Sequence, residues 1–539
     1  MKSRYSKLAI LSLLAGLAGF LLALAPAPFP KLISVPLGFM AALMAGLASW
    51  SIRRAAGLRR GRRLAGLGAT FGVLAAMLGI LGILAFIRKE FHRAQRQQQA
   101  WNQPAPTVEI PAPAPALAAK PAANFTSNLP IVVLQAFGQS ISRHAETLVR
   151  ARCFDTGNGR ASLDAPPDYD GLGTINLRGN TSLHLPKRSF TFHMVNSQTN
   201  QIKVPLLGLP KEEDWVLYAP YEDKTLMRDV LAFELVRKMG RYAPRTRFIE
   251  LFLTSSDGPV SMSHYAGIYV LVEKIKRGKD RVDIAKLEPE HLSEPEITGG
   301  YILKRDHGDR DGRRFNTAHG GPYFYVYPKA EDITAEQRSW LTRYFNAFEE
   351  ALYGENLQDP RTGYAAYLDV ASFIDMHWLI EATKNVDGFR YSAFLTKDRG
   401  GKLRPEPPWD WNRSFGNANY YGGDETHGWY SSNLRPTEIS WYHRLREDPA
   451  FAQRCAARWV YLRKDIFDPK KVQARIDEIA ALLDEAQERN FKRWPVLGQH
   501  VTCNHYVGDS YEDEVRWMKK WIERRIAWID SQVAGARSL

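Results

Sequence analysis

Cysteine is scarce in this chain of 539 residues. Only Cys153, Cys455 and Cys503 are present, which excludes a disulfide framework and a zinc site of four thiolates. At most one disulfide is possible, and Cys455 with Cys503 is a candidate pair if the domain lies outside the cytoplasm. The hydrophobic fraction of 45% and the aromatic fraction of 12% exclude a disordered or collagen-like chain.

Acidic residues are nearly absent from the first hundred positions. This segment has fourteen Lys or Arg and a single acid, Glu90, so it carries almost all of the net charge of +14. The rest of the chain is close to neutral. A near-neutral domain lacks the basic face that general binding to a phosphate backbone requires, and we therefore expect no nucleic-acid partner.

Charge is missing altogether from three apolar stretches, 8–25, 32–50 and 64–87. About twenty apolar residues cross the hydrocarbon core of a bilayer. The pattern predicts a membrane region at 1–97 with about three transmembrane helices. A cleaved signal peptide is the alternative for the first stretch, but Pro26 would hinder cleavage and two more apolar stretches follow.

The distribution of Lys and Arg predicts the orientation of these spans. The N-terminus and the 51–63 loop together carry nine basic residues, and the opposite side carries five. Loops rich in Lys and Arg stay in the cytoplasm. We therefore expect a multi-pass protein of the bacterial inner membrane whose C-terminal domain lies in the periplasm or outside the cell.

Residues 98–130 read as a linker. The proline-rich runs 104–106 and 111–115 cannot form a helix or the interior of a sheet, and they favour a stiff, extended spacer. The main domain is then expected at 131–539.

Hydrophobic periodicity within 131–539 predicts strands first and helices later, which indicates an α+β fold. Strands are expected at 131–135, 174–177, 187–194, 248–253, 265–273 and 299–304. Helices are expected at 226–239, 335–353, 370–383 and 511–533, the first of them ending at Gly240.

Two acids are the main candidates for chemistry. Asp387 follows a predicted helix, and Asp410 lies between two tryptophans. If 391–396 and 402–406 form a hairpin, its ends bring the two carboxylates near each other. Phosphoryl transfer needs such a pair, one acid to orient the acceptor hydroxyl and one to hold a divalent metal. The alternative is structural, with one acid capping a turn and the other buried in a hydrogen-bonded tryptophan cluster.

Several short strings resemble the CotH-type atypical protein kinase family, named for a spore-coat protein. They occur in the family's order and span about 130 to 530. They are LRGNTS (177–182), PKRSF (186–190), AGIYVLVE (266–273), GGYILK (299–304), NVD (385–387) and WDWN (409–412). The resemblance implies a protein-kinase-like fold that transfers phosphate from ATP to Ser or Thr.

The resemblance also implies roles for individual residues. Asp387 resembles the catalytic-loop acid, and Asp410 resembles the metal-binding acid that replaces the aspartate of the Asp-Phe-Gly motif. Lys187 or Arg188 would contact the nucleotide phosphates, and Arg178 could do the same. A solvated pair on an edge strand is the alternative for Lys187 and Arg188.

Three further positions are ambiguous. Glu273 ends a predicted strand and could hold a lysine or a metal, or be a surface acid. The family commonly has Asn five residues after the catalytic acid, where this chain has Ser392, and a second Asp where this chain has Asn412. The carbonyl oxygen of Asn412 can still bind Mg²⁺, but without charge it would hold the metal less tightly.

A possible zinc site lies near the C-terminus. His500, Cys503 and His505 place a thiol between two imidazoles, so zinc is conceivable, although a plain turn is favoured. The 306–312 segment is acidic and rich in glycine but lacks the glutamate that closes a calcium loop.

The sequence thus predicts a membrane-anchored kinase that uses ATP with Mg²⁺ or Mn²⁺ and phosphorylates Ser or Thr of an envelope or coat protein. The alternative is a catalytically weak or inactive module of the envelope, because Ser392 and Asn412 stand where the metal cage should be strongest and ATP is scarce outside the cytoplasm. A transferase acting on a small molecule or a glycan is a third reading.

Overall fold

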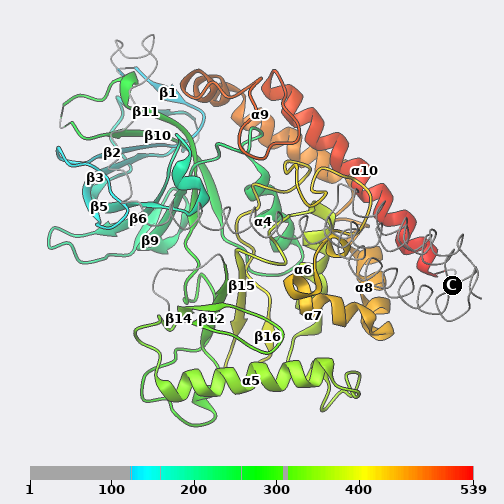
Figure 1. The fold of residues 1–539 in the computed structure, drawn as a ribbon. Coiled ribbons are helices and arrows are strands. Elements are labelled where there is room, and N and C mark those ends of the chain that lie inside the picture. The colour runs from blue at the N-terminus through cyan, green and yellow to red at the C-terminus, as the bar shows by residue number, and fades with distance from the viewer. Residues whose placement is uncertain (1–121, 123, 158, 257, 307–313, 538–539) are drawn as a thin grey trace, which may run out of the picture. The chain divides into compact units, whose positions relative to one another are not determined.

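Strands dominate the first half of the folded chain (Figure 1). The computed structural model describes residues 122, 124–157, 159–256, 258–306 and 314–537. No helix within these residues is long and apolar enough to span a membrane. The three predicted spans lie outside the described residues, so they stay a prediction.

The first part of the described chain closes into a barrel of seven strands. Their order is β10-β11-β9-β6-β5-β3-β2, and the closing pair, β2 with β10, is parallel whereas the other pairs are antiparallel. The strands are β2 (Ile131–Gln135), β3 (Thr147–Phe154), β5 (Tyr169–Arg178), β6 (Ser189–Val195), β9 (Asp214–Tyr218), β10 (Thr246–Thr254) and β11 (Tyr265–Glu273).

Strand β11 is buried on both faces, which explains its unbroken apolar sequence. Tyr269 and Leu271 pack in the barrel interior, while Ile268, Val270 and Val272 join the core of the helical half. The side chains alternate because successive residues of a strand point to opposite faces. Burying each large aliphatic side chain contributes about 1.5–3 kcal/mol to stability, so β11 joins the two halves of the domain.

A second, five-stranded antiparallel sheet lies beside the helices. Its order is β13-β14-β12-β15-β16, and helix α5 (Ala335–Tyr353) runs along it (Figure 1). Trp340 of α5 stacks on Tyr301 of the sheet with ring centroids 6.1 Å apart. The strands are β12 (Tyr301–Arg305), β13 (Arg314–Phe315), β14 (Tyr323–Tyr327), β15 (Ala393–Lys397) and β16 (Leu403–Arg404).

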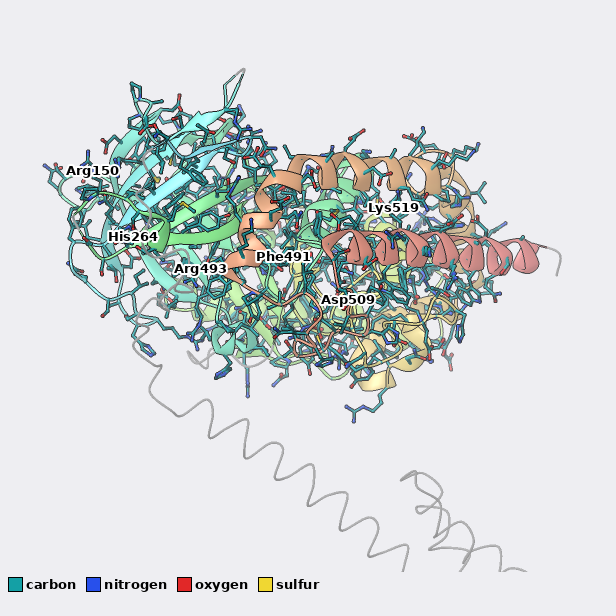
Figure 2. All side chains as sticks on the ribbon, turned by 90° about the horizontal axis from the view of Figure 1, so that it is seen from above. Arg150, His264, Phe491, Arg493, Asp509 and Lys519 are labelled. Carbon is teal, nitrogen blue, oxygen red and sulfur yellow. The ribbon has the colours of Figure 1, made fainter. Side chains whose placement is uncertain are left out.

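Six further helices complete the helical half. Helices α9 and α10 lie side by side (Figure 2), and the C-terminal end of α9 reaches the barrel, where Arg493 donates to the Tyr265 carbonyl at 2.9 Å. The helices are α4 (Arg228–Lys238), α6 (Val370–Thr383), α7 (Pro436–Glu447), α8 (Pro449–Leu462), α9 (Pro469–Arg493) and α10 (Tyr511–Arg537). Helix α6 is buried along nearly its whole length, so the loop that follows it starts from a fixed point.

The predicted α+β character is confirmed, and several predicted elements have the observed bounds. These are β2, β11, α5 and α6. Part of the predicted linker is folded, because Ala122 and Leu129 are buried and β1 (Thr126–Ser127) pairs with β4 (Ala161–Ser162). The described fold therefore starts before residue 131.

Candidate active site

The exit of helix α6 brings Asp387 close to Asp410. After α6, Lys384 adopts a left-handed conformation with φ 44°, and the chain turns toward the β15–β16 hairpin. The Asn385 side chain joins the two acidic segments, since its Oδ1 accepts from the Asp387 amide at 3.1 Å and its Nδ2 donates to the Asp410 carbonyl at 3.2 Å. The predicted hairpin forms, and the predicted convergence of the two acids is found.

The Asp410 loop is held from two sides. Asp410 itself has φ 65°, an unusual conformation for a non-glycine residue that surrounding contacts must stabilise. The next residue, Trp411, donates its amide to Asp229 of α4 at 2.8 Å and its ring nitrogen to Thr383 of α6 at 2.9 Å. On the open side, Ser392 Oγ donates to Asp410 Oδ2 at 3.3 Å.

Burial is the main influence on the pKa of Asp410. Burial raises the pKa of its carboxyl to about 6; Arg413 opposes the rise, and the charges of Asp387, Glu222 and Asp306 add to it. The nearby guanidinium therefore does not fully offset burial and the surrounding acids. A carboxylate in this state is stabilised by an added cation.

A buried acid, Glu222, connects the two acidic segments. Asn412 Nδ2 donates to Glu222 Oε2 at 3.0 Å, and Arg413 Nη2 donates to Glu222 Oε1 at 3.2 Å. The other end of the Arg413 guanidinium lies 3.9 Å from Asp387 Oδ2, and Asp387 Oδ1 accepts from Arg390 at 3.2 Å. The nitrogen of the Asn412 amide is thus engaged by Glu222, and its Oδ1 is the atom left to bind a metal.

Sequence reasoning missed Glu222. It lies in the segment between β9 and α4, 190 residues before Asn412, and no motif or spacing links the two positions. A loop acid before a helix is ordinarily exposed, whereas Glu222 is only 3% exposed. The one available signal was the pair of acids at 222 and 223, which is too common to identify a site.

Arg178 joins the same cluster. It ends β5, and its guanidinium lies 5.1 Å above the centre of the Trp409 ring. Burial lowers its pKa to about 10, and the charges of Asp410 and Asp306 oppose that shift. A cation is therefore positioned on the barrel side of Asp410, where it can meet an anionic ligand.

Lys187 and Arg188 lie apart from this cluster. Lys187 is 1% exposed, and its ammonium donates to the Ile268 carbonyl at 2.5 Å and to Asn490 Oδ1 of α9 at 2.9 Å. Burial lowers its pKa well below the ordinary value. Arg188 Nε donates to the Leu185 carbonyl at 2.6 Å. Both cations are therefore used in local contacts of the protein.

Glu273 belongs to a separate buried ion-pair cluster. Its carboxylate pairs with Arg281 at 2.5 Å and with Arg245 at 2.6 Å, and it accepts from Tyr242 at 3.1 Å and from the Arg245 amide at 3.0 Å. The side chains of Glu273 and Arg281 are fully buried. Its partners are thus arginines and a tyrosine, not a lysine or the Asp410 cluster.

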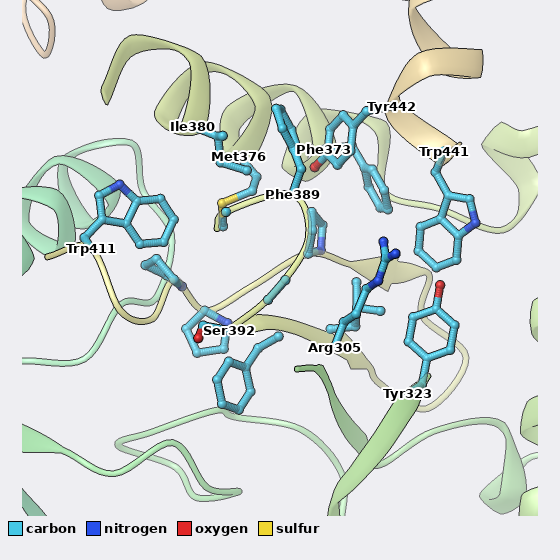
Figure 3. A pocket seen from close by; sticks show the side chains of 17 residues that line it. Arg305, Tyr323, Phe373, Met376, Ile380, Phe389, Ser392, Trp411, Trp441 and Tyr442 are labelled. Carbon is cyan, nitrogen blue, oxygen red and sulfur yellow. The ribbon is translucent and has the colours of Figure 1, made fainter. Parts of the chain in front are cut away.

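An apolar pocket borders the two acids (Figure 3). It lies between α6, α7 and the second sheet, and Ser392 and Trp411 form the part of its wall next to Asp410. The Arg305 side chain reaches into it from β12. Other lining side chains include Phe373, Met376, Ile380, Phe389, Phe394, Trp441 and Tyr442. Asp387 keeps 16% of its side chain exposed, so the acidic cluster is open to a substrate.

The cysteines and the C-terminal histidines form no comparable centre. Cys153, Cys455 and Cys503 are buried and free, so the candidate disulfide between Cys455 and Cys503 is absent. His505 faces Asp424 at 3.3 Å. Among the described residues the one group with metal-ligand spacing is 212–214, and all three of its acids already pair with Lys276. Most of the 306–312 segment lies outside the described residues.

The structure is thus an α+β domain in which Asp387 and Asp410 lie near each other, beside Arg178 at the end of a barrel strand. Comparison with known families identifies its class, because the profile of the CotH kinase protein family matches residues 175–529. This match covers about two thirds of the sequence and includes both acids. The chain belongs to the CotH kinase family. No curated protein matches the sequence significantly.

Proposed function

We propose that this protein is a membrane-anchored kinase that transfers the γ-phosphoryl group of ATP to a Ser or Thr hydroxyl of an envelope or coat protein. Membership of the CotH kinase family supports a kinase-related activity, with ATP, a divalent metal and a protein substrate. The observation that carries the proposal is the meeting of Asp387 and Asp410 at the end of the β15–β16 hairpin, joined by Asn385.

The residues around Asp410 fit a divalent metal. Mg²⁺ and Mn²⁺ prefer oxygen ligands, and the Asp410 carboxylate with the Asn412 amide oxygen supplies them. Burial raises the pKa of Asp410 against the charge of Arg413, and the neighbouring acids add to the rise. A metal bound here would neutralise charge on the ATP phosphates.

Asp387 would act on the acceptor. Its carboxylate takes the proton of the Ser or Thr hydroxyl while the hydroxyl oxygen bonds to the γ-phosphorus. The bond from that phosphorus to the bridging oxygen breaks, and ADP leaves with the electron pair. Arg390 and Arg413 keep Asp387 oriented.

Arg178 is the cation best placed for the phosphates. It lies beside Asp410 and stacks on Trp409, so its guanidinium can meet phosphate oxygens in its fixed planar geometry. Lys187 and Arg188 are engaged elsewhere, and we propose no phosphate contact for them.

Phosphorylation by the full-length chain in detergent tests the proposal. With labelled ATP, Mn²⁺ and an envelope extract, we expect labelling that falls at least about 100-fold in Asp387→Ala, because a general base contributes about that much, and also in Asp410→Ala. Asp477→Ala, which removes an exposed acid on α9 paired with Lys519, is the control and should retain the labelling. If the unaltered chain neither labels a protein nor binds ATP, the inactive envelope module is the better description.

The membrane anchor is a separate part of the proposal. The uncharged stretches 8–25, 32–50 and 64–87, with the basic residues around them, support a multi-pass anchor in the bacterial inner membrane and a C-terminal domain outside the cytoplasm. Alkaline phosphatase fused to the C-terminus should be active, and a green fluorescent fusion should be dark. The reverse pattern would place the kinase domain in the cytoplasm.

A further inference from the structure

The Arg413 guanidinium lies between two carboxylates of the candidate site, those of Glu222 and Asp387. Arg413 Nη2 lies 3.2 Å from Glu222 Oε1, and Arg413 Nη1 lies 3.9 Å from Asp387 Oδ2. Its side chain is 19% exposed and that of Glu222 is 3% exposed. In a partly buried site, such a permanent charge is only weakly screened.

Few side-chain oxygen atoms of the site remain to bind metal ions. Protein kinases commonly hold two Mg²⁺ ions with a metal-loop aspartate and a catalytic-loop asparagine. Here Ser392 stands five residues after Asp387, and its hydroxyl donates to Asp410 at 3.3 Å. A hydroxyl that donates to Asp410 does not supply the carbonyl oxygen with which the asparagine of other kinases binds a metal ion.

Two acids of the site, Glu222 and Asp387, are already paired with protein side chains. Both oxygens of Glu222 accept from Asn412 and Arg413, and Asp387 is flanked by Arg390 and Arg413. Asp229 and Asp410 have no close guanidinium nitrogen among their described contacts. Asp229 is only 6% exposed and accepts from the Trp411 amide, so Asp410 is the more exposed acid of the two, and Asn412 adds one uncharged oxygen. A single carboxylate with one amide oxygen and the ATP phosphates suits one divalent ion.

We infer that this site binds one divalent cation together with ATP, and that the guanidinium of Arg413 supplies the positive charge that a second metal ion provides in other kinases. The inference rests on the proposed function, because it concerns the metal that accompanies ATP. Arg413 is fixed by Glu222, which gives that missed residue a role as a positioning residue. The inference also explains why Asn412 stands where the family commonly has Asp. A second carboxylate is not needed if the Arg413 guanidinium takes the place of the second metal ion.

Counting bound Mn²⁺ tests the inference without relying on turnover. The full-length chain in detergent is equilibrated with a non-hydrolysable ATP analogue and Mn²⁺, and free Mn²⁺ is measured by its electron paramagnetic resonance signal. We expect one Mn²⁺ per bound nucleotide at saturation. Two Mn²⁺ ions per nucleotide would overturn the inference but leave the kinase proposal intact, whereas binding of neither nucleotide nor metal would overturn both.

Variants of Arg413 test the role of its positive charge directly. Arg413→Met removes the charge and should weaken analogue binding at least tenfold, while Arg413→Lys keeps the charge and should lose much less. In the double variant Asn412→Asp with Arg413→Met, a second acid replaces the lost cation, and we expect two Mn²⁺ per nucleotide. Equal affinity of the Met and Lys variants in correctly folded protein, checked by circular dichroism, would contradict the role of the guanidinium. The count in the unaltered chain remains decisive if a variant fails to fold.

Discussion

The cluster around Glu273 and the cluster around Asp410 bury acids in different ways. Glu273 is surrounded by two arginines and a tyrosine that donate to both of its oxygens. Asp410 receives a hydroxyl at 3.3 Å and faces the charges of other acids, which with burial raise its pKa to about 6. The arginine partners of Glu273 neutralise its charge and stabilise the edge of the barrel. A buried acid without such partners, like Asp410, is a candidate ligand-binding residue.

Lys187 and Arg178 differ in the same way. Lys187 has two close oxygen acceptors, from β11 and α9, and so contributes to the contact between the barrel and the helical half. Arg178 stacks on a ring and lies among acids. Two cations near each other in the sequence thus serve different purposes, one in folding and the other, as proposed, in phosphate binding.

Removing one partner from the matched cluster should have the largest effect. Glu273→Ala leaves Arg281 buried without its carboxylate, and loss of one partner of a buried pair costs about 3–5 kcal/mol. Asp410→Asn should cost less than about 1 kcal/mol without metal, since it removes a charge that burial disfavours. Urea unfolding at pH 7 in a chelator measures both. An equal loss of unfolding free energy in the two variants would show that the two clusters do not differ in how they stabilise their acids.

A smaller loss is expected where α9 meets β11. Gly267 has φ +103°, and an added Cβ would lie 2.7 Å from Asn490 Oδ1 and 3.1 Å from the Trp494 ring nitrogen. Gly267→Ala should therefore move Asn490 away from Lys187 and cost about 1–3 kcal/mol. Thermal unfolding measures this loss, and Gly535→Ala, where no atom lies within 4 Å, is the control. An unchanged melting temperature in Gly267→Ala would show that α9 can shift at no cost.

Variants of Arg178 and Lys187 should differ in their affinity for ATP. Arg178→Met should weaken ATP binding about tenfold, which corresponds to about 1.4 kcal/mol. Lys187→Met should leave ATP affinity nearly unchanged, because the Lys187 ammonium is hydrogen-bonded to Ile268 and Asn490 and not to the proposed phosphate site. Calorimetric titration with an ATP analogue measures both affinities. A larger loss in Lys187→Met would restore the sequence-based assignment of that lysine.

The smallest effect is expected at an exposed pair on α9. Hydrogen bonding to Arg160 lowers the pKa of Glu485 to about 2, and Glu485 also pairs with Arg489. The ionised carboxylate therefore stabilises the fold above its ordinary pKa, and this contribution is lost as the pH falls toward 2. Because the Glu485 side chain is 38% exposed, we expect Glu485→Gln to cost less than about 1 kcal/mol at pH 7. Melting curves should converge below pH 4.5; a gap that widens in acid would contradict this.

Much of the local structure was predictable from the sequence. The bounds of β2, β11, α5 and α6 follow from apolar periodicity and end signals, and the hairpin placed Asp387 near Asp410. Strands β3, β9 and β14 were missed. Strand β3 does alternate, with exposed Arg150 between buried Val149 and Ala151, but its polar residues weaken the apolar signal.

The candidate site was predictable only where neighbours in space are neighbours in sequence. Asp387, Ser392, Asp410 and Asn412 lie within one short segment, so a hairpin sufficed to relate them. Arg178 was named through the family resemblance, whereas Glu222 comes from a distant part of the chain and was missed. Lys187 and Glu273 resembled site residues in sequence, yet their partners Asn490 and Arg281 are supplied by tertiary contacts.

The sequence by itself determined the family, the α+β character and the pair of acids, because these depend on short-range patterns and recognisable strings. The tertiary structure alone decided which charges are paired. Pairing depends on which side chains from separate elements meet within a few ångströms and on how much water they lose there, and neither quantity is encoded in local spacing.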